Sequence, residues 1–191
     1  MQWLLAGVFC VVSCCAGEDA SQREVLSFWF GEKGFDGSRM RFWFGGDDEI
    51  VDQRIRDEFE EAVLMAAERE LDSWKETAKG RLALIILLDQ FPRNMYRDTL
   101  GAYAFDSLAV ELTLEGLAKG DDYKLSPIEK VFFYLPLEHS ETLKLQNLSV
   151  QKYKELLHSL PDADKPHFEP FLHHAIEHQK EIAEHGKFIN Y

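Results

Sequence analysis

The apolar residues of this chain recur at the spacing of an α-helix along almost its whole length. In the stretch 50–66, acidic residues lie opposite an apolar stripe made of Ile50, Ile55, Phe59, Val63 and Ala66. A period near 3.6 residues places such positions on one face of a helix. No segment alternates convincingly between apolar and polar residues, as a half-buried strand would. The pattern predicts an all-α fold of seven or eight helices joined by short loops.

Capping residues, glycines and prolines predict where these helices begin and end. A serine, threonine or aspartate before a helix can satisfy its free N–H groups, whereas a proline disfavours helix at the residue before it. The predicted starts are Ser21, Asp47 or Asp48, Thr77, Gly101, Ser126, Glu138 and the residue after Pro170. The predicted ends are Phe91 before Pro92, Leu117 before Gly120, an interruption at Pro136, and Ser159 before the loop 161–166.

The first seventeen residues carry no charged side chain and resemble a leader. The apolar run Trp3–Cys15 is too short to span a bilayer comfortably, but it suits the apolar region of a signal peptide, with Ala16 and Gly17 for cleavage. The usual Lys or Arg before the run is missing, and the alternative is a misassigned start codon. We therefore expect a leader over 1–17 and a single helical domain over 18–191. The protein is exported if the leader is real and cytoplasmic otherwise.

Charge and cysteine content exclude several classes of partner and chemistry. The chain has 21 basic and 34 acidic residues, for a net charge of −13, and no local basic patch, so we expect no nucleic-acid partner. All three cysteines lie in the predicted leader, so the remaining domain has no thiol for a disulfide, a nucleophile or a metal. The chain has neither a phosphate-binding loop nor a dinucleotide glycine motif, and we expect no cofactor.

The apolar run Leu82–Leu88 ends abruptly in a dense set of polar side chains. One interpretation is structural: these side chains satisfy the last carbonyls of a buried helix and pair buried charges. The other is a polar pocket, in which the arginines bind an anionic group and His139 moves a proton. The two interpretations are compatible. The candidate residues are Asp89, Gln90, Arg93, Asn94, Arg97 and Asp106, together with Glu138, His139 and Glu141.

Two further groups of residues have alternative interpretations. The aromatic groups 28–30 and 42–44 predict core packing, with the wall of a ligand site as the alternative. The segment His174–His178 matches the H-x-x-E-H pattern of some zinc proteases. The third ligand that such a site needs is missing, so we predict a solvated histidine-rich helix face and no metal, with His174 and His178 as weak candidates.

Four segments together resemble a known family. They are FWFG from Phe28, FWFGGD from Phe42, LALIILLDQFPRNMYR from Leu82 and YLPLEHSETLKLQNLSV from Tyr134. In this order and spacing they resemble the DUF924 family of unknown function, over nearly all the chain beyond the leader. The family is similar to tetratricopeptide-repeat proteins, and this resemblance implies stacked antiparallel helical hairpins.

The resemblance implies no established reaction, so two classes of function remain. The leading hypothesis is a helical binding or scaffold protein whose polar cleft holds a small anionic ligand, a peptide or a protein partner. The alternative is a hydrolase-type enzyme that uses His139 together with Glu138, Glu141 or Asp89. A histidine beside a carboxylate is a common general base, because the carboxylate orients the imidazole.

Overall fold

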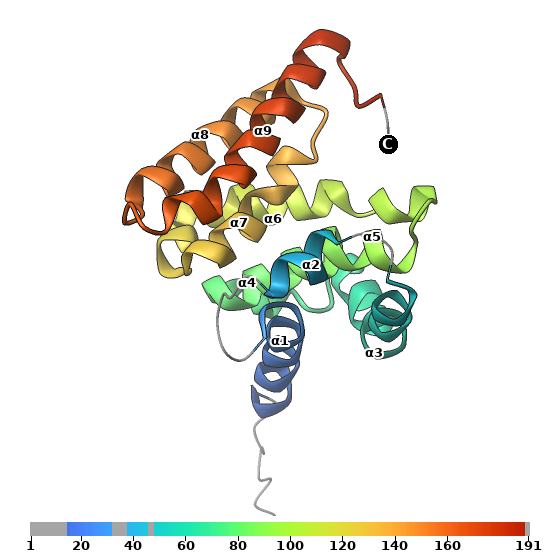
Figure 1. Cartoon of the computed structure of the whole chain (residues 1–191). Coiled ribbons are helices and arrows are strands. Elements are labelled where there is room, and N and C mark those ends of the chain that lie inside the picture. The colour runs from blue at the N-terminus through green and yellow to red at the C-terminus, as the bar shows by residue number, and fades with distance from the viewer. Residues whose placement is uncertain (1–14, 32–37, 46–47, 190–191) are drawn as a thin grey trace, which may run out of the picture.

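A computed structural model describes residues 15–31, 38–45 and 48–189 of the chain (Figure 1). The described residues form helices and connections and contain no strand, which confirms the all-α prediction. The predicted leader falls mostly outside these residues, as does the cap candidate Asp47. The α-helices are α1 (Cys15–Phe30), α2 (Ser38–Phe44), α3 (Glu49–Ala67), α4 (Ala78–Ile85), α5 (Phe91–Met95), α6 (Asp106–Lys119), α7 (Pro127–Glu138), α8 (Leu143–Ser159) and α9 (Lys165–His185).

Short helical segments of other types fill the connections. A π-helical segment, η2 (Ile86–Gln90), joins α4 to α5 without a break. Three 3₁₀ segments are η1 (Asp72–Glu76), η3 (Leu100–Tyr103) and η4 (Asp121–Lys124). If the continuous run from α4 through α5 is taken as one helix, the described residues contain eight helices, as predicted.

Three predicted caps are present in the structure. The Asp48 carboxylate accepts the N–H groups of Ile50 and Val51, at 3.1 and 3.2 Å. The Thr77 hydroxyl accepts the Gly80 N–H at 2.9 Å, and the Glu129 carboxylate accepts the Ser126 N–H at 2.8 Å. These short-range contacts begin α3, α4 and α7, so the sequence predicted those three starts correctly.

The prediction that Pro92 ends its helix is wrong. Helical structure continues through η2 into α5 and ends at Met95, and Pro92 lies in the first turn of α5. In η2 the hydrogen bonds span five residues, as in the bond from the Phe91 N–H to the Ile86 carbonyl. A π turn changes the hydrogen-bonding register, and a proline is tolerated in the first turn of the α-helix that follows.

Five other predicted boundaries differ from the structure. Ser21 lies inside α1, which starts at Cys15, and Gly101 lies in η3 before α6 starts at Asp106. The next helix, α7, continues past Pro136 to Glu138, so α8 begins only at Leu143. The last helix begins at Lys165 and contains Pro170. Tertiary burial keeps α7 helical across its proline, because local propensity is weak beside the packing of a buried helix.

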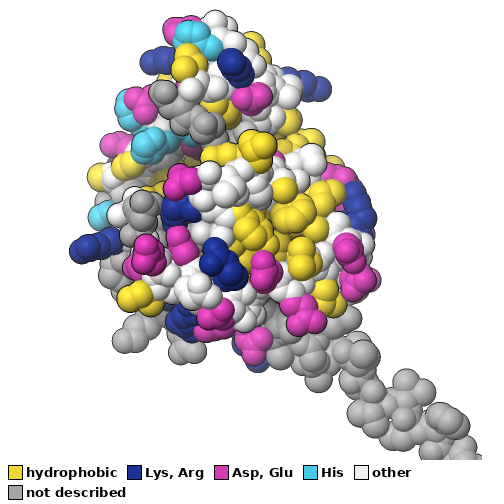
Figure 2. Space-filling view, turned by 90° about the vertical axis from the view of Figure 1, so that its right-hand side faces the viewer, with side chains coloured by type: hydrophobic (Ala, Val, Ile, Leu, Met, Phe, Trp, Pro, Cys, Tyr) yellow, Lys and Arg dark blue, Asp and Glu magenta, His cyan; other side chains and the backbone are white. Residues whose placement is uncertain are grey.

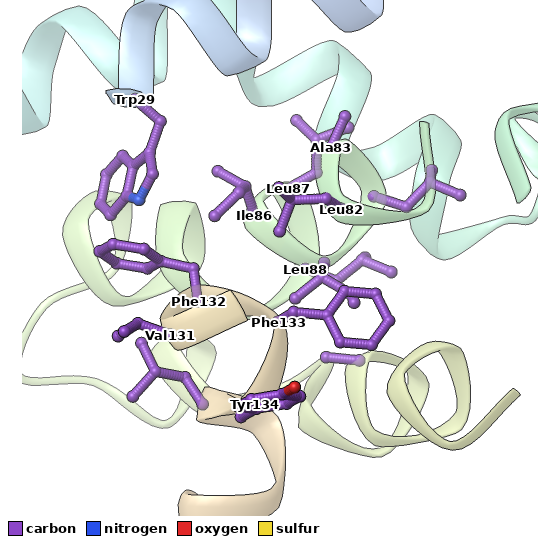
Figure 3. Packing of buried hydrophobic residues seen from close by; sticks show 14 of the residues in the cluster. Trp29, Leu82, Ala83, Ile86, Leu87, Leu88, Val131, Phe132, Phe133 and Tyr134 are labelled. Atoms are coloured by element: carbon purple, nitrogen blue, oxygen red, sulfur yellow. The ribbon is translucent and has the colours of Figure 1, made fainter. Parts of the chain in front are cut away.

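The core lies where α4 and η2 pack against α7 (Figure 3). Every residue from Leu82 to Leu88 is at most 2% exposed, as the apolar run predicted. Trp29 packs edge-on against Phe91 and Phe132, with ring centroids 5.7 and 5.5 Å apart. The 28–30 and 42–44 aromatic groups therefore include core residues. Ile50 is 81% exposed and does not belong to the buried stripe of α3.

The remaining helices pack on two sides of this core. Helices α8 and α9 pack along each other and α8 also packs on α7, while α1 and α3 lie on the opposite side of α4 and α5 (Figure 1). The tetratricopeptide-like stacking implied by the resemblance stays a prediction. Within the described part of the chain, no helix combines the length and apolarity that crossing a bilayer requires.

Candidate functional site

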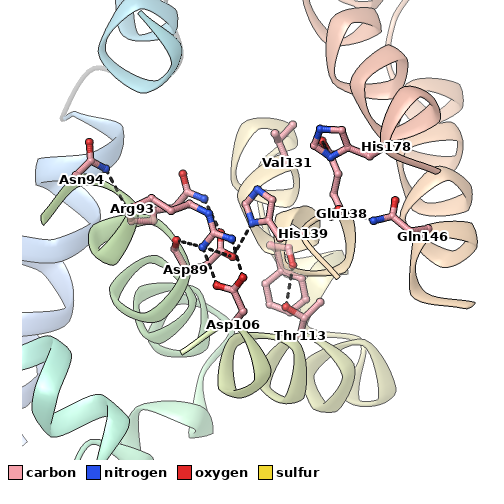
Figure 4. Close-up of polar contacts among 12 residues, drawn as sticks. Asp89, Arg93, Asn94, Asp106, Thr113, Val131, Glu138, His139, Gln146 and His178 are labelled. Atoms are coloured by element: carbon pink, nitrogen blue, oxygen red, sulfur yellow. Dashed lines mark hydrogen bonds and ion pairs between the residues drawn. The ribbon is translucent and has the colours of Figure 1, made fainter. Parts of the chain in front are cut away.

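A buried carboxylate and an imidazole meet where the central helical run contacts the end of α7. Asp89 lies in η2 and is fully buried, and His139 is the residue that caps the C-terminus of α7. The Nδ1 atom of His139 lies 2.7 Å from Oδ1 of Asp89 (Figure 4). The two residues are fifty positions apart in sequence, and only the packing of α7 against η2 brings them together.

Arg93 and Asp106 extend this pair into a network of four residues. The guanidinium of Arg93 donates from Nη1 and Nη2 to the two carboxylate oxygens of Asp106, both at 2.8 Å. Its Nη1 also donates to the Asp89 carbonyl at 2.6 Å and lies 3.3 Å from the Asp89 carboxylate. Such a forked, charge-assisted contact holds both aspartates in defined positions.

The network keeps Asp89 ionised. Burial by itself raises the pKa of the Asp89 carboxyl, but the positive charge of Arg93 and the contact with His139 more than offset burial and lower the pKa to about 2. Burial raises the pKa of Asp106 above its ordinary value in spite of the bonds from Arg93. At neutral pH the imidazole of His139 therefore faces a carboxylate, which holds the Nδ1 side of the ring.

A cavity of about 550 Å³ lies beside His139. Within the described part of the chain, Nε2 of His139 makes no hydrogen bond, so this side of the ring is available to a bound molecule. The lining residues come from η3, α6, the end of α7, the α7–α8 connection, α8 and the segment after α9. They are Tyr103, Asp106, Ser107, Val110, His139, Ser140, Glu141, Thr142, Leu145 and Phe188.

The structure divides the predicted site residues between different places. Gln90 donates to the Asp89 carboxylate, and the Asn94 amide donates to the Gln90 carbonyl at 2.9 Å, so both support η2. Arg97 donates twice to Asp52, at 2.9 Å each, and lines a larger hollow of about 750 Å³ against α3. That hollow does not include His139.

The three candidates at the end of α7 also point in different directions. Glu141 lies at the cavity, where its carboxylate accepts the Phe188 N–H at 3.1 Å. Glu138 turns the other way and is buried, with its carboxylate 3.4 Å from Nδ1 of His178. Of the three carboxylates that were candidates to assist His139, only Asp89 makes a direct contact with its ring.

Gln146 is a supporting residue that the sequence did not indicate. Its fully buried amide donates to the carbonyls of Glu138 and Ser140, at 2.6 and 2.7 Å. These two carbonyls flank His139, so Gln146 fixes the backbone on both sides of it. A glutamine within an amphipathic helix carries no distinguishing signal, because an exposed position would have the same residue type.

The Glu138 carboxyl has an environment very different from that of Asp89. Burial raises the pKa of Glu138 to about 8, and burial also lowers the pKa of the neighbouring His178. Near neutral pH this pair is therefore a carboxylic acid beside an uncharged imidazole, which avoids two buried charges.

Replacing Glu138 by glutamine should remove a pH-dependent loss of stability. Between the ordinary pKa near 4.5 and the folded pKa near 8, the unfolded chain releases the Glu138 proton while the folded chain keeps it. Wild-type stability should thus fall as pH rises through this window, by up to about 1.4 kcal/mol per pH unit relative to Glu138→Gln. Urea unfolding between pH 5 and 8.5 measures the difference. Glu184→Gln, at an exposed carboxylate, is the control, and parallel curves for wild type and Glu138→Gln would contradict the prediction.

The histidines of α9 do not converge on one point. His174 is exposed and lies 3.8 Å from Glu177, whereas His178 turns inward to Glu138 and does not share the predicted solvated face. Within the described part of the chain, no group of three or more His, Cys, Asp or Glu side chains is arranged to hold a metal ion.

The fold and site together define an all-helical protein that holds a buried aspartate–histidine pair at the wall of a cavity. The chain belongs to the family described as bacterial protein of unknown function (DUF924), which matches residues 25–189, and the predicted resemblance is thus confirmed. A solved structure of a protein of unknown function from Agrobacterium tumefaciens is similar to it, with 35% identity and a TM-score of 0.74. That similarity covers 89% of this chain and 86% of the other. Comparison with curated proteins gave no significant match.

Proposed function

We propose that the protein is a hydrolase-type enzyme that binds a small molecule in the cavity beside His139 and uses His139 as a general base. The observation that carries the proposal is the 2.7 Å contact between His139 Nδ1 and the buried Asp89 carboxylate. A carboxylate on one ring nitrogen fixes the tautomer and leaves the other nitrogen to take a proton. Nε2 of His139 would accept that proton from a water or from the bound molecule.

The other members of the network have supporting roles in this proposal. Arg93 and Asp106 hold the Asp89 carboxylate in place, and Gln146 holds the backbone on each side of His139. Water activated at Nε2 is the proposed nucleophile. General-base catalysis of this type is worth about 10²–10⁴-fold in rate.

Binding without chemistry is the second candidate, and the apolar part of the cavity wall favours it. Tyr103, Val110, Leu145 and Phe188 offer apolar surface to a ligand. Binding of an anion by the two arginines is less well supported, because Arg93 is engaged with Asp106 and Arg97 with Asp52. An anion would have to displace a carboxylate from one of them.

Substitution of His139 by glutamine should lower turnover strongly if His139 is the base. A panel of small esters, amides, lactones and phosphoesters provides the search for a substrate. We expect His139→Gln and Asp89→Asn each to lower kcat by about 10²–10⁴-fold with little change in KM, because both remove proton transfer and not binding.

The control for this experiment is His158→Gln, which replaces an exposed histidine of α8 outside the cavity. Circular dichroism of each variant checks that the helices are intact. A kcat in His139→Gln close to that of the wild type would reject the role of His139. A complete lack of turnover, together with saturable binding of panel compounds, would support the binding function instead.

A further inference from the structure

The charge of the cavity beside His139 points to the kind of molecule that it accepts. We propose that the cavity binds a small organic cation, with an ammonium group near Glu141 and an apolar body against the aromatic wall. This names a substrate class for the function proposed above and rests on the same site. It also replaces the anionic ligand that the arginines suggested.

The first argument is the composition of the cavity wall. The ten lining residues include two acidic side chains, Asp106 and Glu141, and no lysine or arginine. Asp89 lies directly behind His139 and adds another carboxylate, while Arg93 supplies one positive charge to the group. Three carboxylates and one guanidinium leave a net negative charge at this place. Such a site attracts cations and repels anions, most strongly at low ionic strength.

The lysines closest in sequence to Glu141 and Phe188 do not change the negative charge of the cavity. Lys144 and Lys187 are exposed, and neither lines the cavity. On the face of the molecule shown in Figure 2, Asp and Glu side chains lie beside an apolar area, with Lys and Arg side chains among them. The net charge of the chain, −13, has the same sign as the cavity.

The second argument is the state of the Glu141 carboxylate. Its Oε1 atom accepts the Phe188 N–H at 3.1 Å, which places the Phe188 ring and the carboxylate at the same cavity. Within the described part of the chain, Oε2 of Glu141 accepts no hydrogen bond. Asp106, in contrast, uses both oxygens to hold Arg93. Glu141 is therefore the carboxylate available to an ammonium group.

The third argument is the aromatic part of the wall. Tyr103 and Phe188 both line the cavity, and a cation over an aromatic face is attracted by the negative charge of the ring face. The guanidinium of Arg93 already lies over the Tyr103 ring, 5.4 Å from its centre, which shows that this ring accepts a cation and leaves the rest of the wall to the ammonium group. Val110 and Leu145 complete an apolar wall that suits the hydrocarbon part of an amine.

The test compares three probes of nearly the same shape on the full chain. Benzylammonium, benzyl alcohol and benzoate differ mainly in charge, and titration of each can be followed through the NMR signals of Tyr103, His139 and Phe188. We expect benzylammonium to shift these signals saturably, to bind more tightly than benzyl alcohol, and to lose affinity as salt is added. Benzoate should bind most weakly. A benzoate affinity equal to or above that of benzylammonium would overturn the proposal.

Two variants locate the effect. Glu141→Gln keeps an acceptor for the Phe188 N–H but removes the charge, so benzylammonium should bind about two- to fivefold more weakly, the range for an accessible charge pair. Glu181→Gln is the matched control, because Glu181 accepts the Ile189 N–H at 2.8 Å but does not line the cavity. Equal affinities in wild type and Glu141→Gln would also reject the proposal.

The failure of this proposal is distinguishable from that of the enzymatic function. Cation binding that depends on Glu141, together with a kcat in His139→Gln close to that of the wild type, would reject only the catalytic role of His139. Turnover that requires His139 but shows no preference for cationic substrates, and no effect of Glu141→Gln, would reject only the substrate class.

Discussion

Replacement of Arg81 by leucine should lower the free energy of unfolding by about 3–5 kcal/mol, because it breaks a buried ion pair with Asp121 and leaves that carboxylate with Lys124 as its remaining partner. The Arg81 side chain is fully buried and donates to Asp121 and Glu115, both at 3.0 Å. It also donates to the Lys75 carbonyl at 2.9 Å. Asp121 is itself only 5% exposed in its side chain, so water cannot replace the lost guanidinium, and the exposed Lys124 pairs only with the other carboxylate oxygen.

Urea unfolding of Arg81→Leu at neutral pH measures this loss. The matched control is Arg54→Leu, since Arg54 pairs with Glu58 on the surface of α3 and its side chain is 61% exposed. An exposed pair contributes less than about 1 kcal/mol. Similar losses of unfolding free energy in the two variants would show that the buried Arg81 pair contributes no more to stability than the exposed Arg54 pair.

Removal of Arg93 should also destabilise the protein strongly. Arg93→Ala leaves the fully buried Asp89 without its nearest cation and frees both oxygens of Asp106. We expect a loss of about 3 kcal/mol, at the lower end of the range for a broken buried pair, because the Arg93 side chain is 18% exposed. Arg93→Lys should lose less, but a single ammonium cannot reproduce the forked contact with Asp106.

The pH dependence of Arg93→Ala provides an independent check. The folded pKa of Asp89, about 2, is below its ordinary value near 3.8, so ionised Asp89 contributes stability that is lost as pH falls between these values. Without Arg93 the folded pKa should rise, and this contribution should become smaller or change sign. Arg97→Ala is the control. Arg97 and its partner Asp52 are both more exposed than Arg93 and Asp89, respectively. An unchanged acid-unfolding midpoint in Arg93→Ala would contradict the expected role of Arg93.

The polar residues after Leu88 have the structural role that the sequence allowed, and Asp89 also belongs to the site proposed above. Gln90, Asn94 and Arg93 bond to backbone or side-chain groups of the central helical run, as the end of a buried helix requires. Asp89 also reaches His139 at the wall of a cavity. The contacts that satisfy the helix end and the contact proposed for function thus lie within one network.

The sequence could predict part of this site because residue type limits chemistry. A buried aspartate needs a partner, and His139 was among the few groups able to provide one. The sequence could not predict the directions in which the neighbouring candidate side chains point. Glu138, His139 and Glu141 are close in sequence, yet they point to His178, Asp89 and Phe188 respectively. The last residue of a helix, its cap and the loop after it project differently, and the pattern of residue types contains no such information.

Sequence by itself determined the features that depend on short-range physics. Helical periodicity gave the all-α class, and the caps at Asp48, Thr77 and Ser126 follow from hydrogen bonds that span two or three residues. The burial of Leu82–Leu88 follows from an apolar run that no single helix face can hold. Each of these requires only the neighbours along the chain.

Tertiary structure decided everything that depends on which helices meet. Arg81 can be buried because Gly116 of α6 leaves room for it, since a Cβ atom at that position would come within 2.5 Å of the Arg81 Cδ. The π segment that carries Asp89, the course of α7 through Pro136 and the two bonds from Gln146 likewise follow from packing between helices. Local propensities amount to fractions of a kcal/mol for most residues, whereas burial of a large side chain contributes about 1.5–3 kcal/mol. Where the two conflict, burial decides the structure.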